Sequence, residues 1–190
     1  MRNYNKTNSG DLRQIEDSIY LVNPDTNWLV SAKEEIEIIR QLLSDIINDV
    51  EHIGSTAIPN IKAKPVIDIM AGLDTLENAR SCIPILENFG YSYWFDNPFP
   101  EHFFFVKGLP SKGGRGRTHH LHIVLRSSDF WEMQVKFRDY LIKNPTEVSE
   151  YENLKLELAK KHENDRDGYT NGKTEFIHSV LRKAGYEFKK

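Results

Sequence analysis

The stretch EHIGSTAIPNIKAKPVIDI, residues 51–69, combines three features that decide the fold. A short apolar run ends just before the pair Gly54-Ser55, two prolines follow, and a β-branched run then encloses Asp68. Because proline fixes φ and lacks an N–H donor, the stretch predicts a strand, a turn, an irregular loop and a buried strand. An ionised carboxylate in a buried strand is costly unless a cation, a metal ion or several donors meet it. Asp68 is therefore a candidate functional residue.

The Gly54-Ser55 turn has two interpretations. Free backbone N–H groups and hydroxyls after a strand suit phosphate oxygens, and Thr56 and Lys64 could add a second hydroxyl and a positive charge. Alternatively, the glycine only allows the chain to bend and the lysine points into water. The pair by itself does not decide between them.

Hydrophobic periodicity predicts the remaining elements. Helices are expected over 32–47, 75–89, 129–143, 146–162 and 171–184, and strands over 50–53, 66–71, 91–95, 102–107 and 119–125. Pro84 would kink or divide the second of these helices. The predicted fold class is α+β, with a mixed β-sheet flanked by helices and a helical C-terminal part.

Length and composition predict one domain. The chain has 190 residues, 39% of them hydrophobic and 28% charged, which suits a globular protein with one sizeable core. We expect a flexible tail over 1–17 and a single domain over 18–190. Within that domain the sheet core would span about 18–127 and the C-terminal helices about 128–187.

Charge and cysteine content narrow the function classes. A net charge of -3 argues against binding of extended nucleic acid, although a local basic patch could still bind one phosphorylated ligand. Cys82 is the only cysteine, which excludes an internal disulfide and a thiolate metal cluster. The sequence shows neither a signal peptide nor a membrane span, so a cytoplasmic location and no membrane partner are expected.

The stretch RTHHLHIVLR, residues 117–126, contains three closely spaced histidines. Strand alternation puts His120 and His122 on one face and His119 on the other, mostly apolar, face. Two imidazoles at this spacing can chelate a transition metal or, when protonated, hold a phosphate. The alternative is that they hydrogen-bond neighbouring carboxylates on an exposed sheet face.

Four separated segments resemble the GrpB family: EHIGSTAIPNIKAKPVIDI, RTHHLHIV, FRDYLIKNPTEVSEYENLK and DGYTNGKTEFI. The resemblance covers about residues 18–186, and the family is similar to the nucleotidyltransferase superfamily. It implies a nucleotidyltransferase-like sheet, a phosphate-binding role for Gly54 and Ser55, and a metal-binding role for Asp68. The sequence departs from the pattern at Met70, where a second metal carboxylate is expected, and a thioether is a poor ligand for magnesium.

Basic residues outside the opening stretch complete the predicted phosphate site. Arg115 and Arg117 lie in a glycine-rich connection that could close over a phosphorylated ligand, although solvated loop charge is the alternative. Arg138, in the family-like FRDYL motif, could reach the site or pair with a nearby carboxylate. Lys173 near a helix start opposes the helix dipole, which indicates an anion or a carboxylate partner.

These residues support three hypotheses. The first is a nucleotidyltransferase-like protein that binds a nucleotide or another phosphorylated ligand, with metal-assisted nucleotidyl or phosphoryl transfer if it is catalytic. Catalysis and metal binding would then fall to Asp68, His120 and His122, with Mg, Mn or Zn as the divalent ion. The second is a non-catalytic binding or regulatory module, which Met70 favours. The third is a metal-dependent phosphohydrolase built on the same residues.

Overall fold

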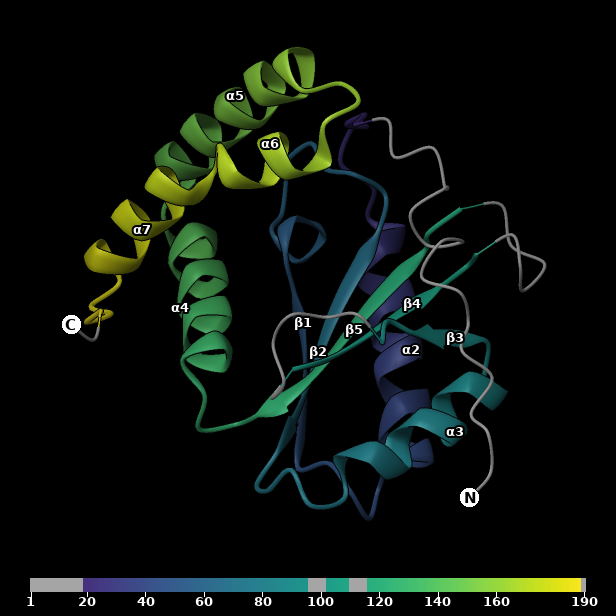
Figure 1. The fold of residues 1–190 in the computed structure, drawn as a ribbon. Coiled ribbons are helices and arrows are strands. Elements are labelled where there is room, and N and C mark those ends of the chain that lie inside the picture. Colours follow the sequence, from purple (N-terminus) through teal and green to yellow (C-terminus); the bar gives the residue numbers. More distant parts are fainter. Residues whose placement is uncertain (1–18, 96–101, 110–115, 189–190) are drawn as a thin grey trace.

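A computed structural model describes residues 19–95, 102–109 and 116–188, so the predicted tail over 1–17 lies outside the described residues (Figure 1). The centre of the described fold is one five-stranded sheet in the order β1-β2-β5-β4-β3. The strands are β1 Asp49–Ile53, β2 Ile67–Leu73, β3 Tyr91–Tyr93, β4 Phe103–Lys107 and β5 His119–Leu125. Only β2 and β5 pair in parallel, and the other three pairings are antiparallel. The predicted mixed sheet is confirmed.

Two helices cover one face of the sheet: α2 Asn27–Leu42 and α3 Cys82–Asn88. Residues of β2 alternate between the faces, so Ile67 and Ile69 enter the core beneath these helices while Asp68 and Met70 face the other way. Helix α2 begins five residues before the predicted start, because Trp28 and the fully buried Ala32 continue its apolar stripe.

Proline divides the helix predicted over 75–89. A 3₁₀ turn, η2 Ala79–Ser81, leads directly into α3 Cys82–Asn88. Pro84 then falls in the first turn of α3, where a missing backbone N–H leaves no hydrogen bond unmade.

Four helices form a second layer on the opposite face of the sheet (Figure 1). They are α4 Asp129–Lys143, α5 Pro145–Lys161, α6 Arg166–Asn171 and α7 Thr174–Lys183. The prediction of one helix over 171–184 was wrong about where the helix starts, because α7 begins at Thr174. A separate short helix, α6, precedes it, and Asp165 caps α6 by accepting a hydrogen bond from the Gly168 N–H. Asn171 therefore ends α6 and does not cap α7.

The loop between β1 and β2 joins the sheet to this second layer. It begins with the 3₁₀ helix η1 Ser55–Ala57, and Ile58 and Ile61 then pack among the apolar side chains of α4, α5 and α7. Burial of these two residues fixes the loop against the C-terminal helices, so the strand ends and the helices enclose a common space.

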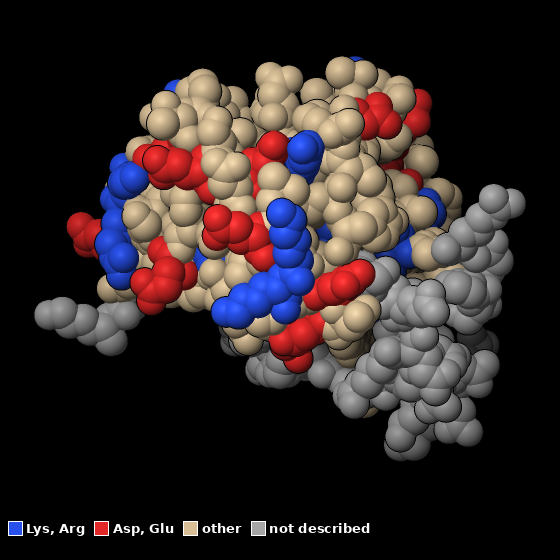
Figure 2. All heavy atoms as spheres, turned by 90° about the horizontal axis from the view of Figure 1, so that it is seen from above, with Lys and Arg blue, Asp and Glu red and all other residues tan. Residues whose placement is uncertain are grey.

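The surface and the helices give two further observations. Figure 2 shows Lys and Arg side chains interspersed with Asp and Glu over the face it presents, so this face is not a continuous basic surface. No helix in the described part of the chain combines the length and the hydrophobicity that a bilayer crossing requires.

Candidate functional site

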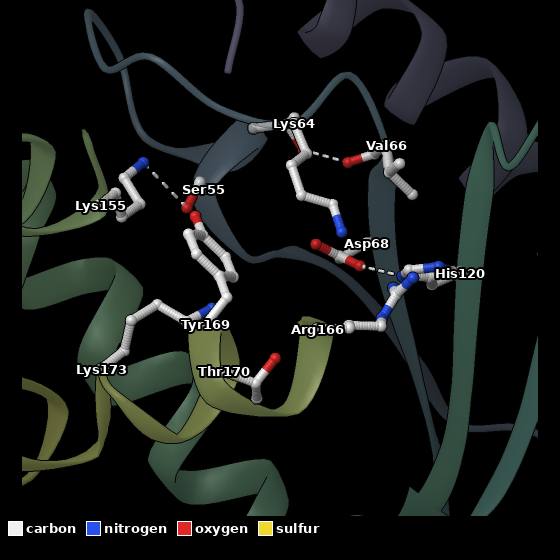
Figure 3. A pocket seen from close by; sticks show the side chains of 11 residues that line it. Ser55, Lys64, Val66, Asp68, His120, Lys155, Arg166, Tyr169, Thr170 and Lys173 are labelled. Atoms are coloured by element: carbon white, nitrogen blue, oxygen red, sulfur yellow. Dashed lines mark hydrogen bonds and ion pairs between the residues drawn. The ribbon is translucent and has the colours of Figure 1, made fainter. Parts of the chain in front are cut away.

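A pocket of about 180 Å³ lies where β2 and β5 meet the C-terminal helices (Figure 3). Its wall comes from the η1 turn, the loop before β2, the first residues of β2 and β5, and helices α5 to α7. The residues that line it are Ser55, Thr56, Lys64, Val66, Asp68, His120, Lys155, Arg166, Tyr169, Thr170 and Lys173.

The parallel pairing of β2 and β5 places Asp68 beside His120. His120 Nδ1 lies 2.8 Å from Asp68 Oδ1, with the two side chains 10% and 29% exposed. Burial lowers the pKa of His120 by more than the hydrogen bond to Asp68 raises it, so the imidazole is neutral and donates its Nδ1 proton. Burial would raise the pKa of Asp68, but the hydrogen bond from His120 and the charge of Lys64 lower it overall, and the carboxylate stays ionised.

Gly54 makes room for this carboxylate. Its φ of 69° and ψ of -171° are available to glycine almost alone, and a Cβ at this position would lie 2.4 Å from Asp68 Oδ2. Gly54 itself is not among the lining residues. The turn that follows, η1, has only three residues, so it is too short to contribute a helix dipole. Ser55 and Thr56 both line the pocket.

Thr56 is largely committed to the turn. Its hydroxyl lies 2.9 Å from His52 Nε2 and donates to the Val66 carbonyl at 3.4 Å, and the residue is only 3% exposed. Burial lowers the pKa of His52 to about 4, so this imidazole is neutral at physiological pH. The contacts connect β1 to the start of β2 and hold the mouth of the turn.

Basic side chains line the pocket on both the Asp68 side and the Ser55 side (Figure 3). Figure 3 shows the ends of Lys64 and Arg166 pointing toward Asp68, and Lys173 reaching in from the start of α7. Burial lowers the pKa of Lys173 to about 8, although the negative charge of Asp68 acts to raise it. Its ammonium lies 4.6 Å from the centre of the Tyr169 ring, within the range of a cation–π contact.

A buried lysine forms the floor beside Ser55. Lys155 is 1% exposed, its Nζ lies 3.3 Å from Ser55 Oγ, and it donates to the Lys62 carbonyl. Burial, followed by repulsion from Lys173, lowers the pKa of Lys155 to about 7. The Tyr151 hydroxyl is also hydrogen-bonded to Ser55.

His122 is on the same face as His120 but does not line the pocket. It lies two residues beyond His120 along β5, where it pairs with Met70 of β2. There it shares a 2.7 Å hydrogen bond with His102 and packs against the Phe130 ring. Burial lowers the pKa to about 3 for His122 and to about 4 for His102, so both rings are neutral.

The donor set does not fit the predicted metal centre. Among residues 19–95, 102–109 and 116–188, no group of three or more His, Cys, Asp or Glu side chains could hold a metal ion. Met70, at the position expected for a second carboxylate, is fully buried against Ile53 and Val124 beneath α4. Asp68 and His120 are left as candidate ligands, and they are hydrogen-bonded to each other.

The predicted arginines lie elsewhere. Arg138 in α4 forms ion pairs with Glu51 and Asp139 and donates to the His52 carbonyl, and it is not a lining residue. Arg117 lies against the Trp94 ring, although its charge lowers the pKa of His120 from a distance. Arg115 lies outside the described residues.

Besides the apolar Val66, sequence reasoning missed four lining residues: Lys155, Arg166, Tyr169 and Thr170. For Lys155 a signal was available, because it follows Tyr151 by four residues and precedes the buried Leu158 by three, so it occupies a core position of an amphipathic helix. A lysine is almost never fully buried without a reason. The other three lie on the short helix α6, whose capping residue Asp165 was not recognised.

Comparisons of the sequence and of the structure with known proteins find relatives in one family. The family model described as "GrpB protein" matches residues 18–183. A UPF0157 protein of Pseudomonas aeruginosa is 36% identical over 170 residues, which make up 89% of this chain and 69% of that protein. The crystal structure of conserved protein GrpB from Enterococcus faecalis has a TM-score of 0.76 and 30% identity, covering 87% of this chain and 96% of that one.

A more distant likeness is to the structure of Cid1, a poly(U) polymerase, in complex with its short product ApU. It has a TM-score of 0.45 and 12% identity, and covers 79% of this chain and 48% of that one. A likeness at this level does not indicate a ligand or a reaction.

Proposed function

The chain belongs to the GrpB family, and we propose that it binds a small phosphorylated ligand, a nucleotide in the first instance, in the pocket described above. One observation carries the proposal: four basic side chains and a single carboxylate line a small pocket that also offers hydroxyl groups. The four are Lys64, Lys155, Arg166 and Lys173.

The energetics of this lining favour an anion. Burial lowers the pKa values of Lys155 and Lys173, and repulsion from Lys173 lowers that of Lys155 while repulsion from Arg166 lowers that of Lys173. The negative charges of Glu152 and Asp68 act in the other direction but do not offset these effects. Phosphate oxygens would supply negative charge and accept hydrogen bonds from the ammonium groups of Lys64 and Lys173, from Arg166 and from the Thr170 hydroxyl. Asp68 would repel an anion placed directly on it, so the phosphate is expected on the lysine side of the pocket.

The nucleotide part of the proposal rests on the resemblance to the nucleotidyltransferase superfamily. Metal-assisted transfer is a weaker expectation, because Met70 occupies the position of the second carboxylate and His122 is turned into the contact with His102. We therefore derive no catalytic step through a metal ion. Binding without two-metal chemistry, as in the predicted regulatory module, suits the buried Met70 best.

Calorimetric titration with ATP and with inorganic pyrophosphate tests the proposal. We expect both to bind, and Lys64→Met and Lys173→Met each to weaken binding by about tenfold to a hundredfold, because each removes a hydrogen bond between charged groups. Lys160→Met, an exposed lysine on α5, is the matched control and should bind as the unaltered protein does.

Two results would contradict the assignment. The first would be that neither ATP nor pyrophosphate binds. The second would be that Lys64→Met and Lys173→Met both bind as tightly as the control, Lys160→Met. Repeating the titrations with Mg, Mn or Zn measures whether affinity depends on a divalent ion, which stays a prediction for this protein.

A further inference from the structure

Ser55 lies between two functional groups of one helix. Its Oγ is 3.3 Å from Lys155 Nζ and is also hydrogen-bonded to the Tyr151 hydroxyl. Tyr151 and Lys155 are four residues apart in α5, so they occupy the same face of the helix and reach the hydroxyl together. Figure 3 shows Ser55 on the pocket wall, with the hydroxyl end of the Tyr169 ring also pointing toward it.

The surroundings of Lys155 favour its neutral form. The side chain is 1% exposed, and this burial outweighs the cation–π contact with the Tyr151 ring, whose centre lies 4.8 Å from Nζ and which favours the charged form. Two charged groups act on it: Lys173 from the start of α7 lowers the pKa, and Glu152 on its own helix raises it. No carboxylate of the described residues forms an ion pair with it, and burial is the largest cause of the pKa of about 7.

The two hydrogen-bond partners of Lys155 determine how its neutral amine would interact with Ser55. The Lys62 carbonyl can only accept, so Lys155 donates one N–H to it. When Lys155 is charged, its Nζ also donates to Ser55 Oγ at 3.3 Å. Once Lys155 has lost a proton, the lone pair on Nζ can accept the proton of the Ser55 hydroxyl. A hydroxyl that donates to an amine in this way is a stronger nucleophile than a free one.

The backbone holds Ser55 at the pocket. It follows Gly54, whose positive φ turns the chain sharply at the end of β1, and it begins the η1 turn that Ile58 and Ile61 hold against the C-terminal helices. A nucleophile needs such a fixed position, because effective attack requires the reacting atoms at about 3–3.5 Å with correct alignment.

We propose that Ser55 is a nucleophile that accepts a phosphoryl group from a phosphoric anhydride, with Lys155 as the general base. In this step Ser55 Oγ forms a bond to the terminal phosphorus, and the bond from that phosphorus to the bridging oxygen breaks with its electron pair going to the leaving group. The hydroxyl proton passes to Lys155 Nζ, which becomes an ammonium ion. Tyr151 is a positioning residue that orients the hydroxyl. The inference rests on the proposed function, since Lys64, Lys173 and Arg166 would bind the anhydride.

A fluorophosphonate probe tests the nucleophile without any assumption about the natural ligand. Attack by an activated hydroxyl forms a phosphorus–oxygen bond and expels fluoride, and peptide mass mapping identifies the modified residue. We expect labelling at Ser55, with a rate that rises with pH through about 7 as Lys155 loses its proton. Ser55→Ala should abolish labelling, and Lys155→Met should slow it by about a hundredfold or more.

Three further variants separate catalysis from structure. Lys155→Arg keeps a hydrogen-bond donor but cannot become neutral, so it should remain as slow as Lys155→Met if Lys155 is the base. Ser149→Ala and Lys160→Met alter exposed residues of the same helix and should label at the normal rate. Normal labelling of Lys155→Met or Lys155→Arg would overturn the role of Lys155, and labelling of another residue would overturn that of Ser55.

Incubation with ATP tests the donor class directly. We expect the mass of one phosphoryl group on the peptide that contains Ser55, and its absence from Ser55→Ala. Pyrophosphate titration and thermal unfolding of the same preparations distinguish the possible failures. Pyrophosphate binding in folded protein with neither probe nor ATP modifying Ser55 would refute the nucleophile and leave the binding function standing. Probe labelling without pyrophosphate binding would refute the phosphorylated ligand instead.

Discussion

Replacing Gly54 by alanine should be costly for two separable reasons. The backbone angles at this position cost a residue with a side chain about 1–3 kcal/mol. The new Cβ would also lie 2.4 Å from Asp68 Oδ2, so the carboxylate would have to move away from His120. Loss of that hydrogen bond costs a further ~1.5–3 kcal/mol.

Alanine also has a favourable effect, because it restricts the unfolded chain and thereby stabilises the protein by about 0.4–1 kcal/mol. The net loss in the free energy of unfolding is therefore expected at about 2–5 kcal/mol. Urea denaturation followed by tryptophan fluorescence measures it, and Gly90→Ala is the matched control. Gly90 also has a positive φ of 90°, but a Cβ there meets nothing within 4 Å, so its variant reports backbone strain alone.

A double-variant cycle with Asp68→Ala isolates the contact. When the carboxylate is absent, alanine at position 54 should cost less than in the unaltered protein, leaving its backbone strain and a 3.0 Å contact with the Cβ that residue 68 keeps. The reasoning is refuted if Gly54→Ala costs the same free energy with and without Asp68, because the clash would then not exist.

Three further predictions concern residues around the pocket. Arg138→Met should lower the free energy of unfolding by about 2–4 kcal/mol, because it leaves Glu51 uncompensated, yet pyrophosphate affinity measured by calorimetry should not change. The folded-state pKa values of His102 and His122, about 4 and about 3, lie below that of an unfolded histidine, so their contribution to stability is complete above pH 6.5 and is lost as the pH falls toward 4 and 3. His122→Phe should therefore make stability in urea less sensitive to pH between 6 and 4, and an unchanged slope would contradict this. Pyrophosphate affinity should fall as the pH rises through about 8, where Lys173 loses its charge, and Lys173→Arg should move that fall to higher pH.

Local patterns predicted much of the fold. The helix over 129–143 and the strand over 119–125 agree with α4 and β5 to the residue, because an apolar period of 3.6 or 2 is a local signal. Alternation also assigned His120 and His122 to the same face of the sheet correctly. The short helix α6 was missed because six residues carry too little periodicity to be recognised.

Local patterns could not predict how far along the strand each side chain lies or which residues it contacts from distant parts of the sequence. Alternation gives the face of His122 but not the partner, and here β4 brings His102 against it. The register that joins Asp68 to His120 instead of His122 depends on pairing between residues 52 positions apart. Lys155 and Ser55 are 100 positions apart, and no local pattern relates them.

The wide spread of the lining residues along the chain has a consequence during synthesis. Because the pocket needs segments from Ser55 through Lys173, a growing polypeptide on the ribosome has no complete place for a ligand until the segment that carries Lys173 has emerged. A small molecule that occupies the pocket would therefore stabilise finished molecules and leave truncated ones unprotected. Degradation of incomplete chains would then proceed even where the ligand is abundant.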